Sequence, residues 1–143
     1  MIYFLILTDN ELSYDDYSED FPIGFFETKK QAEETAQYYL KNIKGFCDFN
    51  CTYHILKKEI ADNPNNILPD TIWIVQGWNI NKNFDETNII ESPCFLTETR
   101  AKSEMNLMKN KYHREEWVVN KWKIGELEWQ EGFVRMIGDT PLN

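Results

Sequence analysis

The 143-residue sequence contains few of the residues that build common catalytic and cofactor sites. Its six glycines do not cluster, so it has no glycine-rich loop of the kind that cradles phosphates. Its three cysteines, an odd number without a disulfide spacing, are typical of a reducing compartment, and we expect a cytoplasmic protein. The apolar run Met1–Leu7 is too short for a membrane span and lacks the features of a signal peptide, so we expect no membrane association.

Basic residues are scarce relative to acidic ones. The chain has 24 Asp and Glu residues against 15 Lys and Arg residues, which gives a net charge of −9. Such a charge repels nucleic acid, so we expect no direct nucleic-acid contact and predict a basic protein as partner. Residues 1–69 carry −6 of this charge and residues 70–143 carry −3, which suggests different roles for the two halves.

An internal repeat is what the sequence does contain. A shift of 69 residues places Thr28 on Thr97 and Ala32 on Ala101, and the pattern of apolar positions is kept although identity is low. This pattern is typical of a tandem duplication. A unit of about 60 residues buries little surface alone, so we expect the two copies to pack as one compact unit about a pseudo-twofold axis.

Each copy is predicted to form strand, strand, helix and strand. The expected elements are strands at about 2–8, 23–27 and 51–60 with a helix at about 29–44, then a strand from Ile72, a helix at about 98–112 and a strand at about 117–129. A Thr-x-x-Gln capping box at Thr28 predicts the first helix start, and Ala36 and Met105 are expected on the buried faces of the two helices. The directions of these elements predict an α+β fold with an antiparallel sheet in order 2-1-3 and one helix per repeat.

The predicted boundaries follow from these elements. The first β-β-α-β repeat covers residues 1–60, and a linker at 61–71 contains Pro64 and Pro69. The second repeat covers 72–133, and 134–143 form a C-terminal tail.

The segment from Ile23-Gly-Phe-Phe-Glu-Thr through an Ala- and Glu-rich helix to Lys44-Gly-Phe resembles a small uncharacterised bacterial domain. That domain commonly ends in Trp-x-Glu-Gly-Phe, and Trp129-Gln-Glu-Gly-Phe133 closes the second copy here. The resemblance covers most of residues 1–60 and, more weakly, 72–133, where the Ile-Gly element and the Gly-Phe before the last strand are missing. It implies the β-β-α-β fold and a bacterial or phage setting, and it implies no activity.

The loop from Asp9 to Asp20 is the main candidate binding site, because it holds six acids and no base. A calcium-binding EF-hand loop is disfavoured, since Tyr14 stands where such a loop needs Gly and Asp20 where it needs Glu. Two interpretations stay open: a solvated loop, and a docking surface whose carboxylates steer a cationic protein while tyrosines anchor it. The candidate partner-binding residues are Asp9, Glu11, Tyr14, Asp15, Asp16, Tyr17, Glu19 and Asp20.

Cys47, Cys51 and His54 invite a zinc hypothesis. However, a strand over 51–60 places Cys51 and His54 on opposite faces, so we expect free thiols and neither metal nor cofactor. We name no catalytic residue, because no nucleophile stands with a base in a recognisable pattern.

The sequence therefore favours a small acidic protein-binding inhibitor over an enzyme. An immunity protein or a phage-encoded inhibitor that neutralises a cationic toxin or nuclease has this size and charge. The alternative is a small-molecule-binding or enzymatic domain with a site between the two repeats. The oligomeric state stays open.

Overall fold

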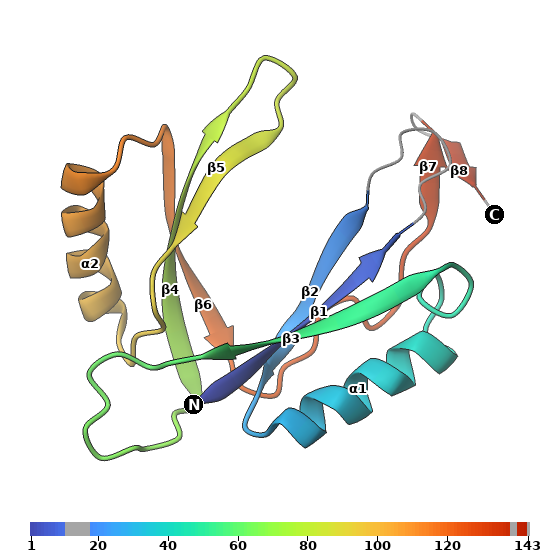
Figure 1. Cartoon of the computed structure of the whole chain (residues 1–143), viewed down its shortest axis with the longest axis horizontal. Coiled ribbons are helices and arrows are strands. Elements are labelled where there is room, and N and C mark those ends of the chain that lie inside the picture. Colours follow the sequence, from blue (N-terminus) through green and yellow to red (C-terminus); the bar gives the residue numbers. More distant parts are fainter. Residues whose placement is uncertain (11–17, 138–139, 143) are drawn as a thin grey trace. The chain divides into compact units, whose positions relative to one another are not determined.

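The structure is a computed structural model that describes residues 1–10, 18–137 and 140–142. The element bounds are β1 Ile2–Asp9, β2 Glu19–Phe26, α1 Lys29–Asn42, β3 Cys51–Lys58, β4 Thr71–Ile80, β5 Glu86–Glu91, α2 Glu98–Lys111, β6 Glu116–Lys123, β7 Arg135–Ile137 and β8 Thr140–Leu142 (Figure 1). Two antiparallel three-stranded sheets, ordered β2-β1-β3 and β5-β4-β6, alternate with two helices. The predicted α+β class, the β-β-α-β pattern and the strand order are confirmed.

The chain divides into two compact units. We call Ile2–Lys57 together with Gly125–Asn143 the terminal unit, and Lys58–Ile124 the middle unit. The middle unit is therefore inserted into the sequence of the terminal unit. Residues 125–133 were predicted in the second repeat, whereas they belong to the terminal unit, which contains the first repeat.

Both helices begin where the sequence predicts. The Thr28 hydroxyl accepts a hydrogen bond from the Gln31 backbone N–H (3.1 Å), and the Gln31 side chain accepts one from the Thr28 N–H (3.2 Å), which completes the capping box. At the start of α2 the Thr97 hydroxyl accepts a hydrogen bond from the Arg100 backbone N–H (3.2 Å), without the reciprocal side-chain bond. Ala36 is fully buried, as predicted.

The buried face of α2 differs slightly from the prediction. Met105 is only half-buried, and the buried residues of this helix are Ala101 and Met108. Met105 still packs against the core of the middle unit, which Val75 and Phe95 help to form. Met105 therefore lies on the core-facing side of α2, as predicted, but it is only half-buried rather than buried.

Two strand limits differ from the prediction by several residues. β2 begins at Glu19, earlier than expected, and β6 ends at Lys123 rather than at Trp129. The chain leaves the middle sheet at Gly125, which has φ +84° and whose N–H donates to the Phe25 carbonyl of the terminal unit (2.8 Å). A positive φ suits glycine and ends the strand, so the predicted extension of β6 was wrong.

Phe133 joins the C-terminal segment to the first sheet. Its ring stacks on Phe21 with centroids 4.5 Å apart and meets Phe46 at an angle with centroids 4.9 Å apart. Its backbone N–H donates to the Lys44 carbonyl (3.1 Å). A β-carbon added to Gly45 would lie only 2.6 Å from the Phe133 ring, so the glycine permits this packing. The Gly-Phe pairs at 45–46 and 132–133 thus meet in one aromatic cluster.

Phe133→Ala should destabilise the terminal unit, because it removes a buried aromatic ring and leaves a cavity. The expected loss is about 3–5 kcal/mol in the free energy of unfolding, measured by urea denaturation. Val134→Ala, at an exposed neighbouring position, is the matched control and should cost less than about 0.5 kcal/mol. Equal stability of the two variants would contradict the packing described for Phe133.

Candidate functional site

The terminal unit holds almost all of the excess negative charge. It contains 14 acidic and 6 basic residues, a net charge of −8, whereas the middle unit contains 10 acidic and 9 basic residues, a net charge of −1. The partition is sharper than the −6 and −3 of the two sequence halves, because residues 125–143 bring further carboxylates to the terminal unit. The charge that favours a basic partner is therefore concentrated in one folded unit.

Asp9 lies at the end of β1 and is fully buried. Arg135 donates two hydrogen bonds to its carboxylate, from Nε (2.9 Å) and from an Nη (2.7 Å), in a fork-like arrangement. The same guanidinium lies over the Phe49 ring, 3.7 Å from its centroid. The carboxylate of Asp9 is an internal ion-pair partner, which corrects its place among the candidate docking residues.

Glu19 and Asp20 are exposed at the start of β2, where they pair in register with Asp9 and Thr8. Partial burial, and after it the negative charge of Asp9, raise the pKa of Glu19. Asp20 accepts a hydrogen bond from the Thr8 hydroxyl (2.7 Å). The start of β2 therefore presents two carboxylates near the Asp9 ion pair, and the bond from Thr8 fixes that of Asp20. The other five candidates lie outside the described residues: Glu11, Tyr14, Asp15, Asp16 and Tyr17.

Further exposed carboxylates of the terminal unit come from segments far apart in the sequence. They are Glu27, Glu34, Asp48, Glu126, Glu128 and Glu131. The last three stand on the C-terminal segment, which Tyr39 of α1 holds by donating its hydroxyl hydrogen to the Glu128 carbonyl (2.8 Å). That these three carboxylates belong to the terminal unit could not be predicted from the sequence, since no local pattern shows that this segment returns to the first sheet.

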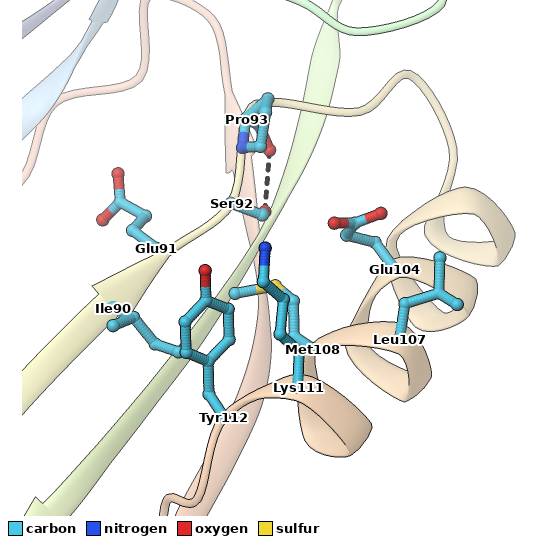
Figure 2. A pocket seen from close by; sticks show the side chains of 9 residues that line it. All are labelled: Ile90, Glu91, Ser92, Pro93, Glu104, Leu107, Met108, Lys111 and Tyr112. Carbon is cyan, nitrogen blue, oxygen red and sulfur yellow. Dashed lines mark hydrogen bonds between the residues drawn. The ribbon is translucent and has the colours of Figure 1, made fainter.

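The middle unit has a groove of about 410 Å³ between β5 and α2 (Figure 2). Its apolar side chains are Ile90 from β5 and Leu107, Met108 and Tyr112 from α2 and its C-terminal end. Its polar lining residues are Glu91, Ser92, Glu104 and Lys111. The groove is therefore a mixed surface lined mainly by one strand and one helix.

Several of the groove's polar groups are already engaged within the protein. Ser92 donates to the Pro93 carbonyl (2.8 Å), the bond drawn in Figure 2, and accepts from the Val75 N–H (2.9 Å). Glu91 pairs with Lys58 (2.7 Å) and accepts from the Gln76 amide (2.8 Å). These bonds hold β5 and its exit in place, and they leave fewer polar groups to orient a small ligand.

The three thiols differ in exposure. Burial raises the pKa of Cys51 to about 11 and that of Cys94 to about 12, so both stay protonated and weakly nucleophilic at neutral pH. Cys47 is exposed and its thiol donates weakly to Asp48 (3.6 Å). His54 is exposed while Cys51 is half-buried on β3, as their strand positions predict. Within the ranges described, no three His, Cys, Asp or Glu side chains gather into a set that could hold a metal ion.

Comparisons of the chain with protein-family models, with curated proteins and with solved structures gave no match. The resemblance to a small bacterial domain therefore stays a prediction. Among the residues described, neither helix is long and apolar enough to cross a bilayer.

Arg135→Met should destabilise the protein strongly, because it removes the guanidinium that neutralises the buried Asp9 carboxylate. Breaking one side of a buried ion pair typically costs about 3–5 kcal/mol, to be measured as the free energy of unfolding in urea. The double variant Asp9→Asn with Arg135→Met should cost less than the sum of the two single variants. Strict additivity would show that the two side chains do not stabilise one another.

Alkylation by iodoacetamide should follow thiol exposure and pKa. Cys47 should react first, and Cys51 and Cys94 should react slowly in the folded protein until the pH approaches their raised pKa values of about 11 and 12. In urea all three should react at similar rates. Mass spectrometry of timed samples measures the order, and equal reactivity of Cys94 and Cys47 at neutral pH in the folded protein would contradict it.

Proposed function

We propose that the protein is a small acidic inhibitor whose terminal unit binds a basic protein in the cytoplasm. An immunity protein or phage-encoded inhibitor that covers the cleft of a cationic toxin or nuclease is the form of this function that we favour. The observation that carries the proposal is the net charge of −8 on the terminal unit, against −1 on the middle unit.

The expected physical effect of this uneven charge distribution is electrostatic steering of a basic partner toward the terminal unit. Clustered carboxylates create a negative potential that raises the rate of encounter with a basic surface, and this effect falls as salt screens it. The Asp9–Arg135 ion pair supports the proposal, because it fixes the end of β1, where the acidic loop begins. Glu19 and Asp20 at the other end of that loop are held by strand pairing.

The groove of the middle unit supports a small-molecule-binding function less well than the charge of the terminal unit supports binding of a basic protein. Its Ser92 and Glu91 groups already form hydrogen bonds within the protein. Burial of a small ligand there would have to compete with bonds that hold β5. Glu19, Asp20 and the other exposed carboxylates of the terminal unit, which we call its acidic face, need no such rearrangement to meet a basic protein.

Neutralising the acidic face should slow association without unfolding the protein. The test variant combines Asp15→Asn, Asp16→Asn, Glu19→Gln and Asp20→Asn. The partner is first isolated from the source cells with the tagged wild-type chain, identified and purified. Stopped-flow association rates are then measured at low and at physiological ionic strength. We expect the variant to associate about tenfold or more slowly at low salt, with a weaker salt dependence and a nearly unchanged melting temperature.

A matched variant removes the same number of exposed carboxylates from the middle unit: Glu59→Gln, Asp70→Asn, Glu98→Gln and Glu116→Gln. It has the same net charge as the test variant, so it separates a local face from overall charge. Its association rate should stay within about threefold of the wild type. Equal slowing by the two variants, or recovery of a partner that is not basic, would overturn the proposal.

A further inference from the structure

The turn between β4 and β5 places an aromatic residue where a glycine would be expected. The Asn81 N–H donates to the Asp85 carbonyl (3.0 Å) and the Phe84 N–H donates to the Asn81 carbonyl (3.0 Å), which closes a loop of three residues. The third residue of such a loop adopts the left-handed conformation and is usually Gly. Here it is Phe84, with φ +63°.

Other non-glycine residues with positive φ in the described part of the chain have a local explanation. Asp62, Asn66 and Asn88 are residue types that tolerate the left-handed region. Trp129 has φ +58°, but its ring packs edge-on against Phe21 with centroids 4.9 Å apart. The Trp129 ring therefore takes part in the packing of the terminal unit. Phe84 is neither a residue type that tolerates the left-handed region nor a ring packed against the core.

The Phe84 ring gains almost no burial from the fold that would offset the backbone strain. Its side chain is 88% exposed, the highest exposure among the large apolar residues that the structure describes. Ile89 and Ile80 on the same hairpin are 55% and 38% exposed. Figure 1 shows the β4–β5 loop extending past the other elements of the middle unit. A strained and exposed aromatic ring at such a tip is a feature of contact sites rather than of folding.

We propose that Phe84 is the anchor of a second interaction surface, which inserts into an apolar pocket with a basic rim on a protein partner. The ring supplies apolar area at little entropic cost. We expect a basic rim because the charged residues next to Phe84 in the sequence, Lys82, Asp85 and Glu86, sum to one negative charge, and none of the three forms an ion pair within the described ranges. An anionic bilayer would repel a chain of net charge −9, so a protein is favoured over a membrane.

This inference does not depend on the acidic face of the terminal unit. It concerns the middle unit, whose net charge is −1 and whose contribution to binding would be apolar rather than electrostatic. A contact made by Phe84 should therefore show little salt dependence. The two surfaces can be tested separately in the full chain.

Phe84→Asn separates an anchor from a structural residue. Asn tolerates the left-handed conformation and keeps a β-carbon, so the melting temperature should rise by about 2–4 °C. Affinity for the partner should fall at least tenfold, at low and at high salt alike, whereas Phe84→Tyr should stay within about threefold of the wild type. Ile67→Asn is the control, since Ile67 is an exposed apolar residue of the same unit at 57% exposure and should change affinity less than twofold.

The partner is found with the photoreactive analogue benzoylphenylalanine placed at position 84 or at position 67 of the full chain in the source cells. We expect one basic protein crosslinked from position 84 and not from position 67, and this protein is then purified for the affinity measurements. Absence of such an adduct, a lower melting temperature for Phe84→Asn, or unchanged affinity would overturn the proposal.

Two further results would assign the surface elsewhere and overturn the protein-partner proposal. One is a dimer in sedimentation velocity that Phe84→Asn abolishes, which would make a second copy the occupant. The other is Phe84-dependent co-sedimentation with vesicles of phosphatidylcholine and phosphatidylserine, which would make it a membrane. We expect a monomer and no vesicle binding for both the wild type and Phe84→Asn. The crosslink from position 84 should persist in the variant with a neutralised acidic face. This result distinguishes failure of the Phe84 proposal from failure of the proposal for the terminal unit.

Discussion

The terminal unit depends on the return of the C-terminal segment to the first sheet. Phe133 completes the aromatic core there, and Arg135 neutralises a carboxylate buried 126 residues earlier in the chain. The whole middle unit lies in the sequence between these contact partners. The terminal unit therefore forms only when two segments on either side of the middle unit come together. Contacts at such separation carry a large loop-closure entropy, so we expect this closure to be a late step in folding.

The parts of the fold that sequence predicts well are those that local chemistry determines. Thr28 and Thr97 mark helix starts through hydrogen bonds to residues three positions on, and both starts were correct. The repeat offset of 69 residues holds for the starts of β1 and β4 and for both helices, but β5 begins earlier than the offset places it. β6 also follows α2 after a shorter connection than that between α1 and β3. The longer connection in the first copy contains Gly45 and Phe46, which receive Phe133. No local sequence pattern in either copy predicts the contact of Phe133 with Gly45 and Phe46.

The same long-range contact explains why the candidate site was only partly predictable. Asp9 reads in the sequence as the first residue of an acidic loop, yet the guanidinium that binds it stands almost at the other end of the chain. Glu126, Glu128 and Glu131 follow the last strand of the second copy in sequence and still belong to the terminal unit. Charge could be counted from the sequence, but its partition between units required the path of the chain.

The two proposed surfaces both cost stability, in different ways. A net charge of −8 within one unit is self-repulsive, and each further carboxylate adds to that cost. Phe84 costs backbone strain and exposes an apolar ring to water. The aromatic cluster around Phe133 and the Asp9–Arg135 ion pair offset the repulsion in the terminal unit, because they cross-link both ends of the chain into one core. No comparable contact offsets the strain at Phe84 within the described residues, and a partner that buries its ring would recover that apolar surface from water.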